Sequence, residues 1–187
     1  MTWKERLRKL ELSKQWDDAI QFMQSVIRDY TDDVDAYICM NYLLMNLLVE
    51  EDHDRNKSDY YEMLAKKYFN ESYAKFSNSA EYLFFTGTTA VMSEWYFGID
   101  VADYERMLEK AMTLDPDNPL YKRTYYINLD EKIASDKEKM TQYAHITLAK
   151  NSPIQQQLET KGAVGEYILG LMTNWSLHLL GNDLYKK

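Results

Sequence analysis

The sequence predicts an all-α protein, and three features of its 187 residues indicate this fold class. Only six glycines and three prolines are present, which is too few for the many tight turns of an all-β protein. Much of the chain consists of residues that favour helices, namely Leu, Lys, Glu, Met, Ala and Gln. Apolar residues recur at helical spacing along most of the chain. The length suits one domain or one short repeat array.

The N-terminal part is expected to contain four helices. The third, VDAYICMNYLLMNLLV, is apolar almost all the way round, so we expect it to be the central buried helix. Asn41 and Asn46 interrupt it and require hydrogen-bond partners from neighbouring loops, unless they face a groove. The acidic loop EEDHDRNK follows it. The four helices are expected over residues 2–13, 16–29, 34–49 and 58–76.

Five further helices are expected in the rest of the chain. Gly87 lies inside the first of them, where glycine costs about 0.8 to 1 kcal/mol against alanine, so we expect a neighbouring helix to approach closely there. Gly98 is expected to end this helix as a C-cap. Glycines at positions 162, 165 and 170 favour a kink or break in the last helix. The five helices are expected over residues 79–98, 100–115, 119–132, 135–150 and 153–180.

The stretch DVADYERMLEKAMTLDPDNP, residues 100–119, has both of its ends marked. Asp100 is expected to be the N-cap, and Pro116 disfavours helical geometry at the residue before it. Asn118 is then expected to cap the next helix. With an alanine at position 111 ahead of the proline turn, the stretch resembles the second helix of a tetratricopeptide (TPR) repeat. Tyr104 departs from this pattern, because the family has a small residue there.

A second stretch, KQWDDAI, also resembles the TPR family, at the turn between the two helices of a repeat. Trp16 is followed three positions later by the small residue Ala19, and Trp3 stands where the family has its first-helix tryptophan. The resemblance implies a TPR-like α-α superhelix in a single domain, residues 1–187, and a non-repeat helical bundle is the alternative. Its helix pairs would cover about 2–30, 34–77, 79–115 and 119–150, with 153–180 as a capping helix.

The net charge of −8 and a pI near 4.9 argue against nonspecific binding to nucleic acid or to an anionic membrane. They favour a basic partner, unless the charge serves solubility alone. Cys39 is the only cysteine, so no intramolecular disulfide can form. The absence of an apolar signal core and of an apolar run of transmembrane length favours a cytoplasmic location. The sequence leaves the oligomeric state open.

No catalytic, metal or cofactor site is expected from the sequence. His53, His145 and His178 stand alone, without a second histidine or cysteine at metal-ligand spacing. Glycine-rich phosphate loops, GxSxG and C-x-x-C motifs are all missing. We therefore expect a protein that is not an enzyme.

Acidic clusters and a high content of tyrosine and tryptophan are the features that indicate binding. The chain contains 16 tyrosines and 4 tryptophans, side chains that are enriched at protein interfaces, although tyrosines on apolar stripes also fit a core. The TPR resemblance implies that Tyr37, Tyr121 and Tyr125 lie on groove-lining helices. The candidate partner-binding residues are Asp32, Asp33, Asp35, Tyr37, Asn41, Glu50, Glu51, Asp52, Tyr121 and Tyr125.

In size, charge and aromatic content the chain is similar to bacterial immunity proteins, which neutralise cationic nuclease toxins. This resemblance implies that the protein binds and blocks a basic partner. The alternative is a TPR-type peptide-binding adaptor or co-chaperone, for which Lys4, Asn41 and Arg123 are loosely placed. The net negative charge argues against an acidic peptide ligand. A small-molecule regulator or a small enzyme is the third class.

Overall fold

The computed structural model describes residues 1–91, 93–122 and 137–184, and every regular element among them is helical. This confirms the all-α class. The chain divides into two compact units, Met1–Leu114 and Asp115–Lys187. Within the described ranges, no helix combines the length and the apolar character needed to cross a membrane.

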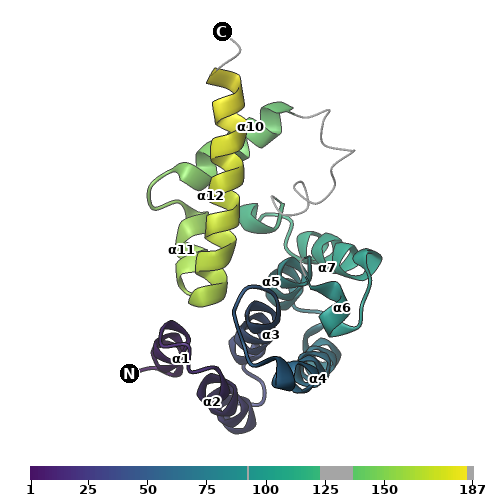
Figure 1. The fold of residues 1–187 in the computed structure, drawn as a ribbon. Coiled ribbons are helices and arrows are strands. Elements are labelled where there is room, and N and C mark those ends of the chain that lie inside the picture. The colour runs from purple at the N-terminus through teal and green to yellow at the C-terminus, as the bar shows by residue number, and fades with distance from the viewer. Residues whose placement is uncertain (92, 123–136, 185–187) are drawn as a thin grey trace. The chain divides into compact units, whose positions relative to one another are not determined.

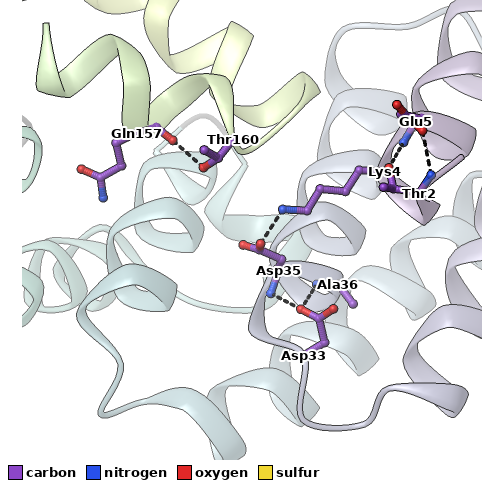
Figure 2. Close-up of polar contacts among 8 residues, drawn as sticks. All are labelled: Thr2, Lys4, Glu5, Asp33, Asp35, Ala36, Gln157 and Thr160. Carbon is purple, nitrogen blue, oxygen red and sulfur yellow. Dashed lines mark hydrogen bonds and ion pairs between the residues drawn. The ribbon is translucent and has the colours of Figure 1, made fainter.

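The first unit begins with four helices whose positions agree with the sequence prediction (Figure 1). Thr2 and Glu5 form a capping box at the first of these helices (Figure 2). Consecutive helices pack against one another along the chain. The helices are α1 (Trp3–Leu12), α2 (Trp16–Asp29), α3 (Val34–Val49) and α4 (Ser58–Phe76), with a short 3-10 helix η1 (Arg55–Lys57) before α4.

Helix α3 is the centre of this unit, as its composition predicts. It packs against α2, α4 and α5, and all its residues from Ala36 to Met45 are buried. A helix covered on three sides needs apolar side chains all round. The largest fully buried side chains of the unit are Tyr37, Tyr82, Phe84, Phe85, Phe97, Ile20, Met23, Ile38, Met40, Leu43 and Leu44.

The prediction of a single helix over residues 79–98 is wrong, because the structure has two helices there. They are α5 (Ala80–Ala90) and the short α6 (Glu94–Phe97). At the break, the Ser93 hydroxyl donates to the Thr89 carbonyl at 2.9 Å, and the Ser93 amide donates to the Ala90 carbonyl at 2.9 Å. Ser93 itself leaves the helical conformation, with φ −159° and ψ 20°. Gly98, at φ 75°, forms the C-cap as predicted.

Gly87 lies where α5 packs against α7 (Val101–Leu114). A Cβ atom at this position would lie 3.1 Å from Leu108 Cδ2 and 3.3 Å from Met107 Cβ. The predicted close approach of a neighbouring helix is therefore confirmed. Asp100 caps α7, since its Oδ1 accepts from the Asp103 amide at 2.9 Å.

In the second unit, Asn118 caps a helical turn at residues 119–122 as predicted, its Oδ1 accepting from the Leu120 amide at 3.1 Å. Most of the helix expected over 119–132, and the start of the one expected at 135, lie outside the described residues. The remaining helices are α10 (Lys137–Leu148), α11 (Pro153–Glu159) and α12 (Ala163–Leu184), and α12 packs against both others.

The final helix expected over residues 153–180 is divided, as the glycine content favours. Helix α11 begins where predicted, with the Ser152 hydroxyl accepting from the Gln155 amide at 3.1 Å. It ends at a turn in which the Thr160 hydroxyl donates to the Gln157 carbonyl (Figure 2). Gly162 has φ 60°, a left-handed conformation that glycine adopts at little cost. Helix α12 then runs on through Gly165 and Gly170.

Candidate binding site

The predicted acidic residues lie at opposite ends of α3. Asp32, Asp33 and Asp35 are at its N-terminus, whereas Glu50, Glu51 and Asp52 follow its C-terminus. A helix of 16 residues is about 24 Å long. The structure therefore separates the two clusters.

The N-terminal cluster is largely explained by folding. Asp33 is the N-cap of α3, and its Oδ1 accepts from the amides of Asp35 at 2.9 Å and Ala36 at 3.3 Å (Figure 2). Lys4 of α1 donates to the Asp35 carboxylate. Negative charge near a helix N-terminus also stabilises the helix dipole. Asp32 is exposed without a hydrogen bond or ion pair among the described residues, but it directly precedes the N-cap of α3. Its charge is thus explained by the helix dipole, and it is no longer a candidate for partner binding.

The C-terminal cluster has the opposite electrostatic setting. Glu50, Glu51 and Asp52 lie next to the negative end of the α3 dipole, where a cation would stabilise and an anion costs about 0.3 to 1 kcal/mol. Lys14 offsets part of this cost, because its Nζ lies 2.8 Å from Glu51 Oε2. Glu50 and Asp52 are exposed and have no ion pair within the described part of the chain. Asp52 interacts through space with the Lys14 charge, whereas folding stability gives no reason for an acidic residue at position 50.

The predicted aromatic and amide candidates are not on an open groove. Tyr37, Asn41 and Tyr121 are buried, because their helices pack on these faces, and this corrects the expectation drawn from the TPR resemblance. The Tyr37 hydroxyl donates to Glu71 and accepts from Lys75 Nζ at 2.9 Å. The Tyr121 hydroxyl accepts from Gln157 Nε2 at 3.3 Å within the second unit. Tyr125 lies outside the described residues.

A pocket of about 300 Å³ opens beside the C-terminal acidic cluster. The turn before α2, the loop after α3 and the first turns of α4 build it. Asp52 is the one predicted candidate that lines it. Sequence analysis missed the others, because Tyr61 lies on an apolar stripe and Trp16 already fits the family turn. The lining residues are Lys14, Trp16, Asp17, Asp52, His53, Asp54, Lys57 and Tyr61.

Asp17 fixes one wall of this pocket. Its carboxylate accepts from Lys57 Nζ at 2.5 Å and from the Tyr61 hydroxyl at 2.9 Å. The hydrogen bond from Lys57 lowers the pKa of Asp17 below its usual value of 3.8. Burial, assisted by the hydrogen bond to Asp17, raises the pKa of Tyr61 to about 12. Tyr61 is thus a neutral donor at neutral pH, and Asp17 is a carboxylate.

His53 holds the loop on the other side of the pocket. Its Nδ1 lies 3.2 Å from the Glu51 carbonyl oxygen, and its Nε2 lies 2.9 Å from Ser58 Oγ. Because a carbonyl can only accept, Nδ1 carries the proton and Nε2 accepts from the serine hydroxyl. The ring also meets Tyr61 edge to face, with centroids 5.8 Å apart. These contacts orient the loop that carries Asp52 and Asp54.

The charge around the pocket is negative in balance. Lys14 pairs with Glu51 and Lys57 pairs with Asp17, so both lysine charges are matched. Asp54 Oδ1 caps η1 by accepting from the Asn56 amide at 3.0 Å, but no cation pairs with Asp54 or Asp52 among the described residues. Four carboxylates, with Glu51 included, thus stand against two lysines. The balance is negative even though Asp52 also acts through space on Lys14 and Asp54 on Lys57.

The lowered pKa of Asp17 predicts a pH dependence of stability. Asp17 binds a proton less readily in the folded state than in the unfolded state. The ionised Asp17 therefore stabilises the fold fully above about pH 5, and this stabilisation is lost as the pH falls through 3.8 and below. The free-energy difference between the wild type and Asp17→Asn, from urea unfolding at several pH values, should shrink over this range. A difference that does not change with pH would contradict the Lys57 contact.

Among the residues that the structure describes, no group of three His, Cys, Asp or Glu side chains could hold a metal ion. Comparison of the chain with protein-family models, with curated proteins and with solved structures found no match. Function must accordingly be argued from the site itself.

Proposed function

We propose that this protein is a non-enzymatic binding module that binds and blocks a basic protein partner, in the way that an immunity protein neutralises a cationic nuclease toxin. The observation that carries this proposal is the placement of Glu50 and Asp52. Both are exposed, unpaired among the described residues and next to the negative end of the α3 dipole. Exposed acidic residues in this position are explained by a partner that supplies positive charge.

Electrostatics would act at two ranges in this mechanism. The net charge of −8 attracts a cationic protein from a distance and raises the association rate. At contact, Glu50, Asp52 and Asp54 would pair with lysine or arginine side chains, which in a nuclease bind the phosphates of its substrate. Occupying those side chains blocks the partner without any chemistry by this chain.

The scaffold of the proposal is a stack of helix pairs in the first unit. The packing of α1 with α2, α3 with α4 and α5 with α7 supports this arrangement, as do the contacts of α3 with α2 and α5. Ala111 is fully buried and Gly87 lies at a close helix contact, which suits the small residues of a TPR-like pair.

The peptide-binding adaptor is less well supported. Of its three candidate clamp residues, Lys4 is paired with Asp35 and Asn41 is buried. Arg123 lies outside the described residues. A clamp for an acidic peptide would also require a positive surface, whereas the pocket beside α3 is negative.

The experiment begins with the purified protein as bait in an extract of its source cells, washed at low and then high salt. A basic protein that leaves as the salt rises is purified, and its association with the bait is measured directly. Replacing Glu50→Gln and Asp52→Asn together should slow association about tenfold at low salt. The same variant should keep or slightly raise the free energy of unfolding, by a few tenths of a kcal/mol.

Asp29→Asn with Asp32→Asn is the matched control for this experiment. It removes the same charge from exposed positions at the other end of α3 and should change the association rate less than twofold. Equal slowing in both variants would show that Glu50 and Asp52 act only through the net charge of the protein and do not contact the partner. An unchanged rate in the first variant would remove this surface from the proposal.

A further inference from the structure

We propose that the pocket beside the C-terminus of α3 receives an arginine side chain of the basic partner. This inference rests on the proposed function, since it names the group that the site would bind. Three features of the pocket lining support it. One wall is aromatic, two carboxylates have no ion pair among the described residues, and the neighbouring side chains are held in place by hydrogen bonds.

Trp16 supplies the aromatic wall. The side chain is half-buried and lines the pocket, and it makes no hydrogen bond or ring contact with any residue that the structure describes. A guanidinium group stacks flat on an indole ring, and this contact contributes about 0.5 to 2 kcal/mol. An indole that faces a pocket without another partner is suited to this role.

Asp52 and Asp54 supply the acceptors. Asp54 uses Oδ1 to bind the amide and the side-chain nitrogen of Asn56, both at 3.0 Å, so its other oxygen is available within the described structure. Asp52 makes no hydrogen bond in the same set. A guanidinium carries five N–H donors in one plane, and two carboxylates beside an aromatic face can accept several of them.

The lysines of the lining do not repel such a guest strongly. Lys57 donates to Asp17, and Lys14 donates to Glu51 at 2.8 Å. Each positive charge therefore has a carboxylate within hydrogen-bond distance, and Asp52 and Asp54 add further negative charge beside Lys14 and Lys57. Because Lys14 is 68% exposed, its side chain can also move aside at small cost.

The pocket is fixed before the guest arrives. Tyr61 is 3% exposed and is held by Asp17 at 2.9 Å, and His53 ties the acidic loop to Ser58. A preformed site avoids the entropy cost of ordering side chains on binding. The planar guanidinium is preferred to an ammonium group, because it can stack on Trp16 and face a carboxylate in two-point contact at once.

The test is a titration of the full-length protein, followed by NMR at the Trp16 indole signal. The signal is identified by its loss in Trp16→Phe. The probes are Nα-acetyl-arginine amide, its uncharged analogue Nα-acetyl-citrulline amide and Nα-acetyl-lysine amide. We expect saturating shifts with arginine at roughly 1 to 10 mM, no saturation with citrulline, and several-fold weaker binding of lysine.

Asp52→Asn should weaken arginine binding about fivefold, whereas Asp32→Asn, which removes the same charge away from the pocket, should change it little. The inference is overturned if arginine gives no saturating shift, if citrulline or lysine binds as well as arginine, or if the two variants weaken binding equally.

This failure differs from failure of the proposed function. If Glu50→Gln with Asp52→Asn slows association with a basic partner but the pocket does not bind arginine, the proposed neutralisation is retained and only the arginine assignment is rejected. If the pocket binds arginine but no salt-sensitive basic partner is found, the arginine site is retained and the proposed neutralisation is rejected.

Discussion

Replacing Gly165 with alanine is expected to destabilise the second unit by about 3 kcal/mol. A Cβ atom at this position would lie 1.9 Å from the Leu158 carbonyl oxygen and 2.8 Å from its carbonyl carbon. Both are backbone atoms of α11, so no side chain can rotate to relieve the contact. Helices α11 and α12 would have to separate at the turn that joins them.

Hydrogen exchange of peptides from residues 153–177 measures this effect within the unit itself. Exchange in Gly165→Ala should be faster by roughly a hundredfold. Gly170→Ala is the matched control, because Gly170 lies in the same helix with no atom within 4 Å of an added Cβ. It should slow exchange about fivefold, because alanine stabilises a helix by about 1 kcal/mol relative to glycine. Equal protection in both variants would contradict the close packing of α11 on α12.

The helices of the first unit could be predicted because their signals are local. Asp33 and Asp100 cap helices that start beside them, and the uninterrupted apolar composition of α3 requires burial on all sides. The break between α5 and α6 could not be predicted in the same way. Ser93 leaves the helical conformation there, although no glycine or proline marks that position in the sequence.

The site was only partly predictable, because charge clusters do not reveal their place in the fold. Asp33 and Glu50 read alike in the sequence, yet one stabilises the start of α3 and the other opposes its end. Tyrosine is common at protein interfaces, yet Tyr37 is fully buried. Lys57 and Tyr61 meet Asp17 across about 40 residues of sequence, and no local pattern records that contact.

The second large effect is expected at Ser72, in the buried polar cluster of the first unit. Ser72 is fully buried, and its hydroxyl donates to the Tyr68 carbonyl at 2.6 Å. It lies 3.1 Å from Asn41 Nδ2 and 2.7 Å from the Tyr82 hydroxyl. Because burial raises the pKa of Tyr82, that hydroxyl stays protonated and donates. One donor and two acceptor positions of the serine are thus all used.

Ser72→Ala removes the acceptor for two buried donors, Asn41 Nδ2 and the Tyr82 hydroxyl. Each orphaned donor costs about 1 to 3 kcal/mol. The Tyr82 hydroxyl can turn in part to the side chains of Thr86 and Asn41, which also lie beside it. The free energy of unfolding of the first unit should therefore fall by about 2 kcal/mol. Hydrogen exchange of peptides from α3 and α4 measures this loss. A loss below about 1 kcal/mol would show that the two donors find other partners.

Asn41→Leu is the informative comparison, because the same network predicts a much smaller effect. Asn41 is fully buried, and its Oδ1 has no hydrogen-bond partner among the described residues. Leucine has a similar shape to asparagine. The substitution loses one hydrogen bond, which destabilises the fold, and removes an unpaired buried oxygen, which stabilises it. The net change in the free energy of unfolding should stay within about 1 kcal/mol. Ser72 keeps its contacts with Tyr68 and Tyr82. If Asn41→Leu cost as much as Ser72→Ala, the asparagine rather than the serine would be the centre of the network.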